Sequence, residues 1–242
     1  MKLHRRDFLT GTALFLLGGF PARADLIKGS LPWQPNAGTP PDVVRPGPWR
    51  FFTGQEGRAM EAVADRFIPP DPQTPGGKDL GCAVFVDRQL AGPYGQQDGD
   101  YVSAPFMKGT RQQGAQTEGG PARTIRDGLA ALDRYCAAQF GGKAFADLSD
   151  DQKDGVLSGL ETDKVKLDRA DGKAFFDEAL KLVQQGFFAD PLYGGNRDMA
   201  AWKMIGFPGV RYNYLDWIDR HNERFPLPPV SIIGRAEWLP NH

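Results

Sequence analysis

The chain has 242 residues, of which 40% are hydrophobic and 24% are charged, and its formal net charge is -1. So balanced a charge provides no basic surface for nucleic acid, and we expect no nucleic-acid partner. The length is sufficient for one domain with a substantial hydrophobic core. Its 30 glycines and 20 prolines show no repeating period, which predicts long ordered loops between short helices.

Residues 1–24 are predicted to be an export signal. Arg5 and Arg6 are followed by Phe8 and Leu9, and this Arg-Arg-x-Phe-Leu pattern is the twin-arginine signature. The apolar run that follows is too short to cross about 30 Å of hydrocarbon as a helix of the mature protein. The pattern therefore predicts a periplasmic protein that uses the twin-arginine translocase as its route.

Ala22 and Ala24 supply the small residues that a signal peptidase requires, which places the cleavage site before Asp25. The leader holds four basic residues and one acidic residue, so the chain after it has a formal charge near -4. The twin-arginine route moves proteins that have already folded, generally because a cofactor or a partner is fitted in the cytoplasm. We therefore expect this chain either to hold a cofactor or to leave the cell with a protein that does.

Residues 25–50 are rich in proline and predict an extended arm. Thr53 and Glu56 have capping-box spacing at the start of the first predicted helix, which Pro69 stops. The short apolar segment 82–90 is also predicted to be helical.

The rest of the chain reads as helices separated by loops. Residues 91–120 are dominated by Gly, Gln, Pro and Asp and predict a long loop. Apolar residues then recur at helical spacing in four segments, and none of the chain alternates as a strand does. These helices are predicted at about 122–140, from a cap at Ser149, at about 171–186 and at about 197–205. The predicted fold is all-α: an irregular helical domain over 51–242 with long ordered loops and a proline-rich N-terminal arm.

The two cysteines, Cys82 and Cys136, leave three arrangements open. In an oxidising compartment they can bond to each other, or one can bond to a partner chain. Cys136 lies on the apolar stripe of its predicted helix, so a buried free thiol is the third arrangement. Two cysteines so far apart do not suit a zinc or iron–sulfur site.

No convincing catalytic, cofactor or metal motif is found. After the leader the only histidines are His221 and His242, which disfavours a histidine triad or a histidine-rich metal site. There is no Walker loop, no haem attachment motif and no dinucleotide fingerprint. Export of a folded chain without a cofactor motif favours a protein that accompanies a cofactor-bearing partner.

The most unusual stretch of the sequence is residues 186–209. Here Asp190 is expected to accept backbone N–H groups of the turn at Pro191, and Gly194-Gly195 permits positive φ. Asn196 or Asp198 is then placed to cap the helix that follows. Local chemistry alone therefore predicts a tightly packed loop.

On these residues the chain resembles the gluconate 2-dehydrogenase subunit 3 family. The matching features, besides the leader, are Phe51-Phe52-Thr53-x-x-Glu56, Ile68-Pro69-Pro70, Asp190-Pro191-x-Tyr193-Gly194-Gly195-Asn196 and Gly206-Phe207-Pro208-Gly209. The resemblance implies a helical, non-catalytic small subunit without its own cofactor, peripheral to the cytoplasmic membrane. It implies a flavoprotein partner of the glucose-methanol-choline oxidoreductase type that holds FAD, and a multihaem cytochrome c subunit that takes the electrons. Gluconate is the expected substrate of the complex.

Aromatic residues and arginines near the C-terminus are the candidates for an exposed partner interface, because both types are enriched in interface cores. The candidates are Phe187, Phe188, Tyr193, Arg197, Trp202, Phe207, Arg211, Tyr212, Tyr214 and Trp217. Two other functions remain open. One is a stand-alone periplasmic enzyme with an unrecognised site near residues 190–198 and His221, and the other is a periplasmic binding or assembly protein.

Overall fold

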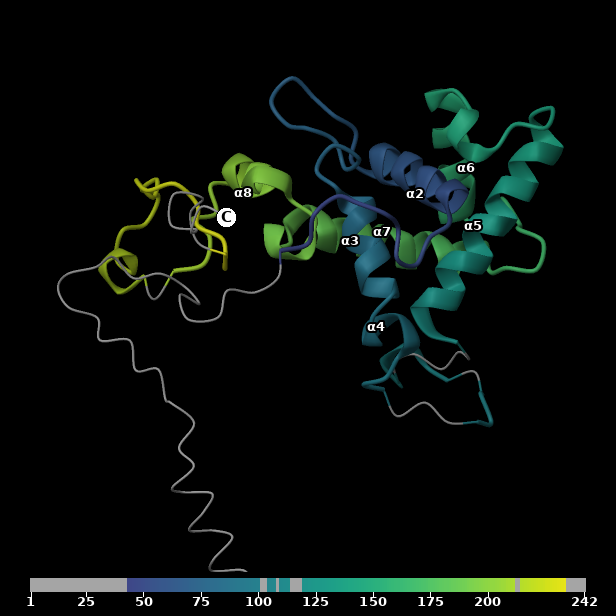
Figure 1. Cartoon of the computed structure of the whole chain (residues 1–242), viewed down its shortest axis with the longest axis horizontal. Coiled ribbons are helices and arrows are strands. Elements are labelled where there is room, and N and C mark those ends of the chain that lie inside the picture. Colours follow the sequence, from purple (N-terminus) through teal and green to yellow (C-terminus); the bar gives the residue numbers. More distant parts are fainter. Residues whose placement is uncertain (1–42, 101–103, 108, 114–118, 212–213, 234–242) are drawn as a thin grey trace, which may run out of the picture. The chain divides into compact units, whose positions relative to one another are not determined.

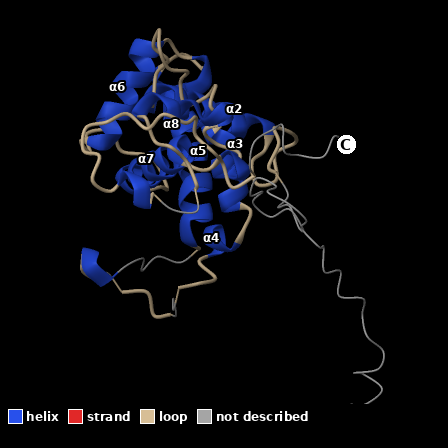
Figure 2. Ribbon diagram, turned by 90° about the vertical axis from the view of Figure 1, so that its left-hand side faces the viewer, coloured by secondary structure: helices blue, strands red, loops and turns tan. Residues whose placement is uncertain are grey.

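The computed structural model describes residues 43–100, 104–107, 109–113, 119–211 and 214–233, and every structural statement below concerns these residues. Their regular structure is helical, and Figure 2 shows only helices and loops among them. The described residues form one β-type pairing, an isolated parallel bridge between Gly209 and Val230. The all-α prediction is confirmed.

The α-helices have the following bounds: α2 Gly54–Phe67, α3 Cys82–Leu90, α4 Pro93–Gln96, α5 Gly120–Gln139, α6 Asp150–Glu161, α7 Gly172–Phe188 and α8 Ala200–Ile205. Shorter 3-10 helices join them: η1 Arg111–Gln113, η2 Phe145–Asp147, η3 Pro191–Tyr193, η4 Arg197–Met199 and η5 Leu215–Trp217. Figure 1 labels the α-helices on the ribbon.

The predicted capping residues begin two of the helices. At the start of α2 the Thr53 hydroxyl accepts the N–H of Glu56 at 3.2 Å, and the Glu56 carboxylate accepts the N–H of Thr53 at 2.7 Å. Ser149 and Gln152 form the same capping box at the start of α6. Each box satisfies two N–H groups that a helix start would otherwise leave unpaired, so these starts are determined locally.

Three boundaries differ from the prediction. The segment 91–120 is not a plain loop, because it contains α4 and η1. Helix α7 continues past Gly186 to Phe188, since this glycine packs closely on Phe85 inside the fold and does not end the helix. The helix predicted at 197–205 is divided into η4 and α8, because Asp198 and Met199 have positive φ.

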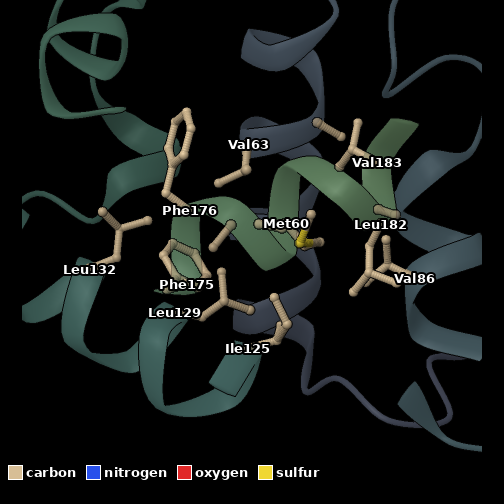
Figure 3. Close-up of a cluster of buried hydrophobic side chains, with 14 of the residues drawn as sticks. Met60, Val63, Val86, Ile125, Leu129, Leu132, Phe175, Phe176, Leu182 and Val183 are labelled. Atoms are coloured by element: carbon tan, nitrogen blue, oxygen red, sulfur yellow. The ribbon is translucent and has the colours of Figure 1, made fainter. Parts of the chain in front are cut away.

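The core is organised around α7, which contacts α2, α3, α5, α6 and α8. Figure 3 shows side chains from α2, α3 and α5 meeting those of α7. The residues labelled there are Met60 and Val63 from α2, Val86 from α3, Ile125, Leu129 and Leu132 from α5, and Phe175, Phe176, Leu182 and Val183 from α7. Burial of this many large apolar side chains is the main favourable contribution to folding.

A buried carboxylate attaches the chain before α2 to α3. Asp87 is 0% exposed and accepts the backbone N–H groups of Arg50, Phe51 and Phe52, each at 2.9 Å. It also forms an ion pair with Arg88. The end of the predicted arm, residues 43–50, is therefore non-helical and held against the domain, whereas residues 25–42 lie outside the described residues.

Both cysteines are free and buried, Cys82 at the start of α3 and Cys136 on α5. The two cysteines do not pair with each other, and full burial leaves neither sulfur accessible to a partner chain. Of the three arrangements, the buried free thiol is the one found. Burial raises the pKa of each thiol to about 12.

We expect neither thiol to react with a maleimide reagent in the native protein at pH 8, and both to react in denaturant. The thiolate is the reactive form, and the raised pKa of Cys82 and Cys136 keeps both protonated. The folded chain holds these protons more tightly than the unfolded chain, whose thiol pKa is near 9.0. The stabilisation is therefore complete below about pH 9 and is lost as the pH rises towards 12. Labelling followed by mass spectrometry measures this, and native labelling or a disulfide would contradict it.

Among the described residues no helix is both long enough and apolar enough to cross a membrane.

Candidate partner-docking surface

The turn after α7 is built around a second buried carboxylate. Asp190 is 7% exposed and accepts the N–H of Leu192 at 2.9 Å, which confirms the predicted turn at Pro191. The same carboxylate accepts the Ser231 hydroxyl at 2.8 Å and the N–H of Ile232 at 2.7 Å. One side chain therefore joins this turn to a segment about forty residues further along the chain.

Asn196 organises the entry into α8. It is 0% exposed, donates from its amide nitrogen to the carbonyl of Ala189 at 2.9 Å, and accepts the N–H of Ala201 at 2.9 Å. Its φ of 45° lies in the left-handed region, which asparagine tolerates better than most residues. Of the two predicted capping residues, Asn196 thus holds the start of this helix, while Asp198 is exposed.

The two glycines of this loop have different roles. Gly194 adopts a φ of 96°, as predicted. Gly195 has no positive φ, but a Cβ added there would lie 2.0 Å from the carbonyl oxygen of Gly186. The loop therefore packs backbone against backbone on the last turn of α7, and only glycine fits.

We expect Gly195→Ala to destabilise the protein by about 2 kcal/mol or more, because the clash is with backbone and forces the loop away from α7. Gly155→Ala is the matched control, since a Cβ on Gly155 in α6 meets nothing within 4 Å. That control is expected to stabilise the protein by about 0.5–1 kcal/mol through helix propensity. Urea denaturation of both variants measures the difference. Equal stabilities would mean that the loop does not pack as described.

Large exposed hydrophobic residues are concentrated after α7. Nine of the eleven among the described residues lie between 188 and 227, a set that we call the C-terminal apolar residues. They are Phe188, Tyr193, Met204, Ile205, Phe207, Val210, Leu215, Ile218 and Leu227. Four of them, Leu215, Ile218, Ile205 and Leu227, are more than half exposed. This concentration of exposed apolar side chains makes the region a candidate for contact with another molecule.

A groove of about 430 Å³ lies between α8 with its following turn and residues 224–229. Most of its lining residues are aromatic residues and prolines, and among the described residues only Lys203 and Arg224 give it charge. We call it the 203–229 groove. The lining residues are Trp202, Lys203, Gly206, Phe207, Pro208, Arg224, Phe225, Pro226, Leu227, Pro228 and Pro229.

The family model described as gluconate 2-dehydrogenase subunit 3 matches residues 54–209. The chain belongs to this family. The match begins at the first residue of α2 and ends at Gly209, so it includes the helical core and the Asp190 turn. Searches of curated proteins and of solved structures found no match. Membership makes the chain an accessory subunit of the gluconate 2-dehydrogenase type.

The subunit 3 family model covers only one wall of the groove. Its match includes α8 and the turn to Gly209, whereas the opposite wall, residues 224–229, follows the matched region. Of the C-terminal apolar residues, Val210, Leu215, Ile218 and Leu227 also lie beyond it.

The interface residues predicted for this subunit 3 chain divide into three groups. The exposed ones are Phe188, Tyr193, Arg197 and Phe207, and the half-buried ones are Arg211, Tyr214 and Trp217. Tyr212 lies outside the described residues. Phe187 and Trp202 are 3% and 5% exposed, so their placement on an exposed surface was wrong.

The two wrong assignments have a physical explanation. Phe187 lies on the inner side of α7, while its neighbour Phe188 points outward with the two rings edge to face at 5.0 Å. Trp202 places its indole in the core and donates its N–H to the carbonyl of Phe188 at 2.9 Å. A buried tryptophan whose polar atom is satisfied internally is a packing residue.

Sequence reasoning also missed the aliphatic part of the surface. Met204, Ile205, Val210, Leu215 and Ile218 were not among the candidates, because aromatics and arginines were favoured.

The residues considered for catalysis are His221 and the loop 190–198. His221 is exposed, and Asp190 is committed to three hydrogen bonds inside the fold. Within the described ranges no group of three or more His, Cys, Asp or Glu residues is arranged to hold a metal ion.

Proposed function

We propose that this chain is the non-catalytic small subunit of a periplasmic FAD-dependent dehydrogenase complex of the gluconate 2-dehydrogenase type, peripheral to the cytoplasmic membrane. The observation that carries the proposal is the family match over residues 54–209. The C-terminal apolar residues support it, because their exposure suits a subunit that functions in contact with another chain.

In this proposal the chemistry belongs to the partners. A flavoprotein of the glucose-methanol-choline type holds FAD and accepts hydride from the sugar acid, and a multihaem cytochrome c subunit takes the electrons. The present chain stabilises the flavoprotein, and its twin-arginine leader takes both through the translocase. The buried free thiols of Cys82 and Cys136 are compatible with this route, because a chain that folds in the reducing cytoplasm protects them before it meets an oxidising compartment.

The test is to express the chain with a C-terminal tag in its native host and purify it from the membrane fraction in mild detergent. We expect a flavoprotein to co-purify, with a flavin absorbance spectrum and gluconate-dependent reduction of a dye. The same preparation from a strain with the untagged chain is the control. A clean monomer with no flavin would contradict the proposal. Turnover of a substrate by that monomer alone would instead support a stand-alone enzyme.

A further inference from the structure

We propose that the 203–229 groove binds an extended, acidic segment of the flavoprotein partner. This inference rests on the proposed function and adds where and by what chemistry the two subunits meet. Three features of the groove support this inference: the charge of its lining residues, the prolines in its second wall, and the aromatic contacts that fix both walls.

The charge of the groove is uncompensated. Lys203 and Arg224 are both exposed, and no acidic residue in the described part of the chain lines the groove with them. Among the described residues neither forms an ion pair, whereas Arg66, Lys173 and Lys181 each have an acidic partner. Two cationic side chains beside an apolar groove that has no carboxylate of its own favour a ligand that carries a carboxylate.

The backbone of the second wall disfavours recognition by strand pairing. Pro226, Pro228 and Pro229 have no N–H to donate, and Pro228 uses its carbonyl to accept the guanidinium of Arg211 at 2.5 Å. The next residue, Val230, is already paired with Pro208 and Val210 in the isolated bridge. A bound segment would therefore contact the aromatic and proline side chains of the groove and would not form backbone hydrogen bonds with it. Other grooves lined by aromatic residues bind extended segments in this way.

Aromatic contacts hold both walls in place without the occupant. On one side the rings of Trp202 and Phe207 meet edge to face at 5.0 Å. On the other side Phe225 lies 5.0 Å from the ring of Trp217 and under the guanidinium of Arg211, which is 4.9 Å from the ring centroid. Since these walls are pre-organised, binding orders few additional side chains of this subunit.

The first test reverses the charge of the groove. The double variant K203E/R224E is compared with K166E/R169E, which makes the same change of charge on exposed side chains outside the groove, each paired only with a nearby exposed aspartate. We expect the groove variant to co-purify at least about tenfold less flavoprotein than wild type, and the control variant to match wild type. Far-UV circular dichroism checks the fold, and the milder K203Q/R224Q is used if the reversal disturbs it.

The second test identifies the occupant. A photo-crosslinking amino acid at Leu227, which is 51% exposed and lines the groove, is expected to capture a flavoprotein peptide that contains aspartate or glutamate beside apolar residues. A crosslink to this chain itself, to lipid or to a peptide without a carboxylate would overturn the inference.

The outcomes separate the inference from the proposed function. If wild type and the groove variant retain equal amounts of flavoprotein, the groove is not the docking site and the subunit role stands. If wild type itself brings no flavoprotein, both proposals fail. Loss in the groove variant alone, with the expected crosslink, supports both.

Discussion

Replacing Arg5 and Arg6 with lysine is expected to leave the chain and the flavoprotein partner proposed above in the cytoplasm, with no periplasmic dehydrogenase activity above that of a strain without the gene. Lysine keeps the positive charge of the leader, but it lacks the planar guanidinium fork that arginine presents to a receptor. A loss of export would therefore report recognition of the arginine pair and not the charge of the leader. Cell fractionation, immunoblots of both subunits and dye-linked activity with gluconate provide the measurement.

The matched control is Arg23→Lys, which makes the same chemical change in the same leader but outside the Arg-Arg-x-Phe-Leu pattern. It is expected to export normally. Normal periplasmic activity in the Arg5 and Arg6 variant would refute the escort role. Export of the flavoprotein while this chain stays behind would show that the partner crosses the membrane by its own means.

Sequence reasoning located the helices well where the determinants are local. The capping boxes at Thr53 and Ser149 need only residues three apart, and the spacing of Ile125, Leu129 and Leu132 repeats the period of the helix. It placed the end of α7 at Gly186, two residues early, because a glycine near a helix end usually stops the helix. Here that glycine is required by the ring of Phe85, which comes from another helix, and no local pattern reports such a contact.

Contacts between distant segments, which no local pattern reports, also explain what could and could not be predicted in the candidate site. The Asp190 turn and the role of Asn196 were predictable, because their partners lie within a few residues. The bonds from Asp190 to Ser231 and Ile232 were not, since they join segments about forty residues apart. The groove depends on the same long-range closure: residues 224–229 form its second wall only where the chain returns to pair Val230 with Pro208 and Val210.

Asp87, like Asp190, joins segments that are far apart in the sequence. Its sequence context did not mark it as important. It lies inside an apolar helical segment, where an isolated aspartate is normally exposed. In the fold it is fully buried and accepts three consecutive backbone N–H groups at residues 50–52 while paired with Arg88. A carboxylate provides enough lone pairs for all of these donors, and a neutral side chain of similar size does not.

We therefore expect Asp87→Ala to lower the free energy of unfolding by about 3–5 kcal/mol, because it leaves Arg88 without its ion-pair partner and three N–H groups, that of Phe52 in a buried bond, without their acceptor. Asp87→Asn is expected to lose less, since its carbonyl oxygen still accepts from the backbone. The control is Asp177→Ala, which removes an exposed carboxylate paired with Lys173 and is expected to change stability by no more than about 0.5 kcal/mol. Urea denaturation followed by circular dichroism gives all three values.

A loss below about 1 kcal/mol for Asp87→Ala would show that the chain before α2 does not depend on this carboxylate. Native-state hydrogen exchange distinguishes local from global effects in that case. If the amides of Phe51 and Phe52 exchange faster while the core amides of α7 do not, Asp87 attaches only the arm. If all of them exchange faster, the attachment of residues 43–52 and the packing of α3 on α7 form one cooperative unit.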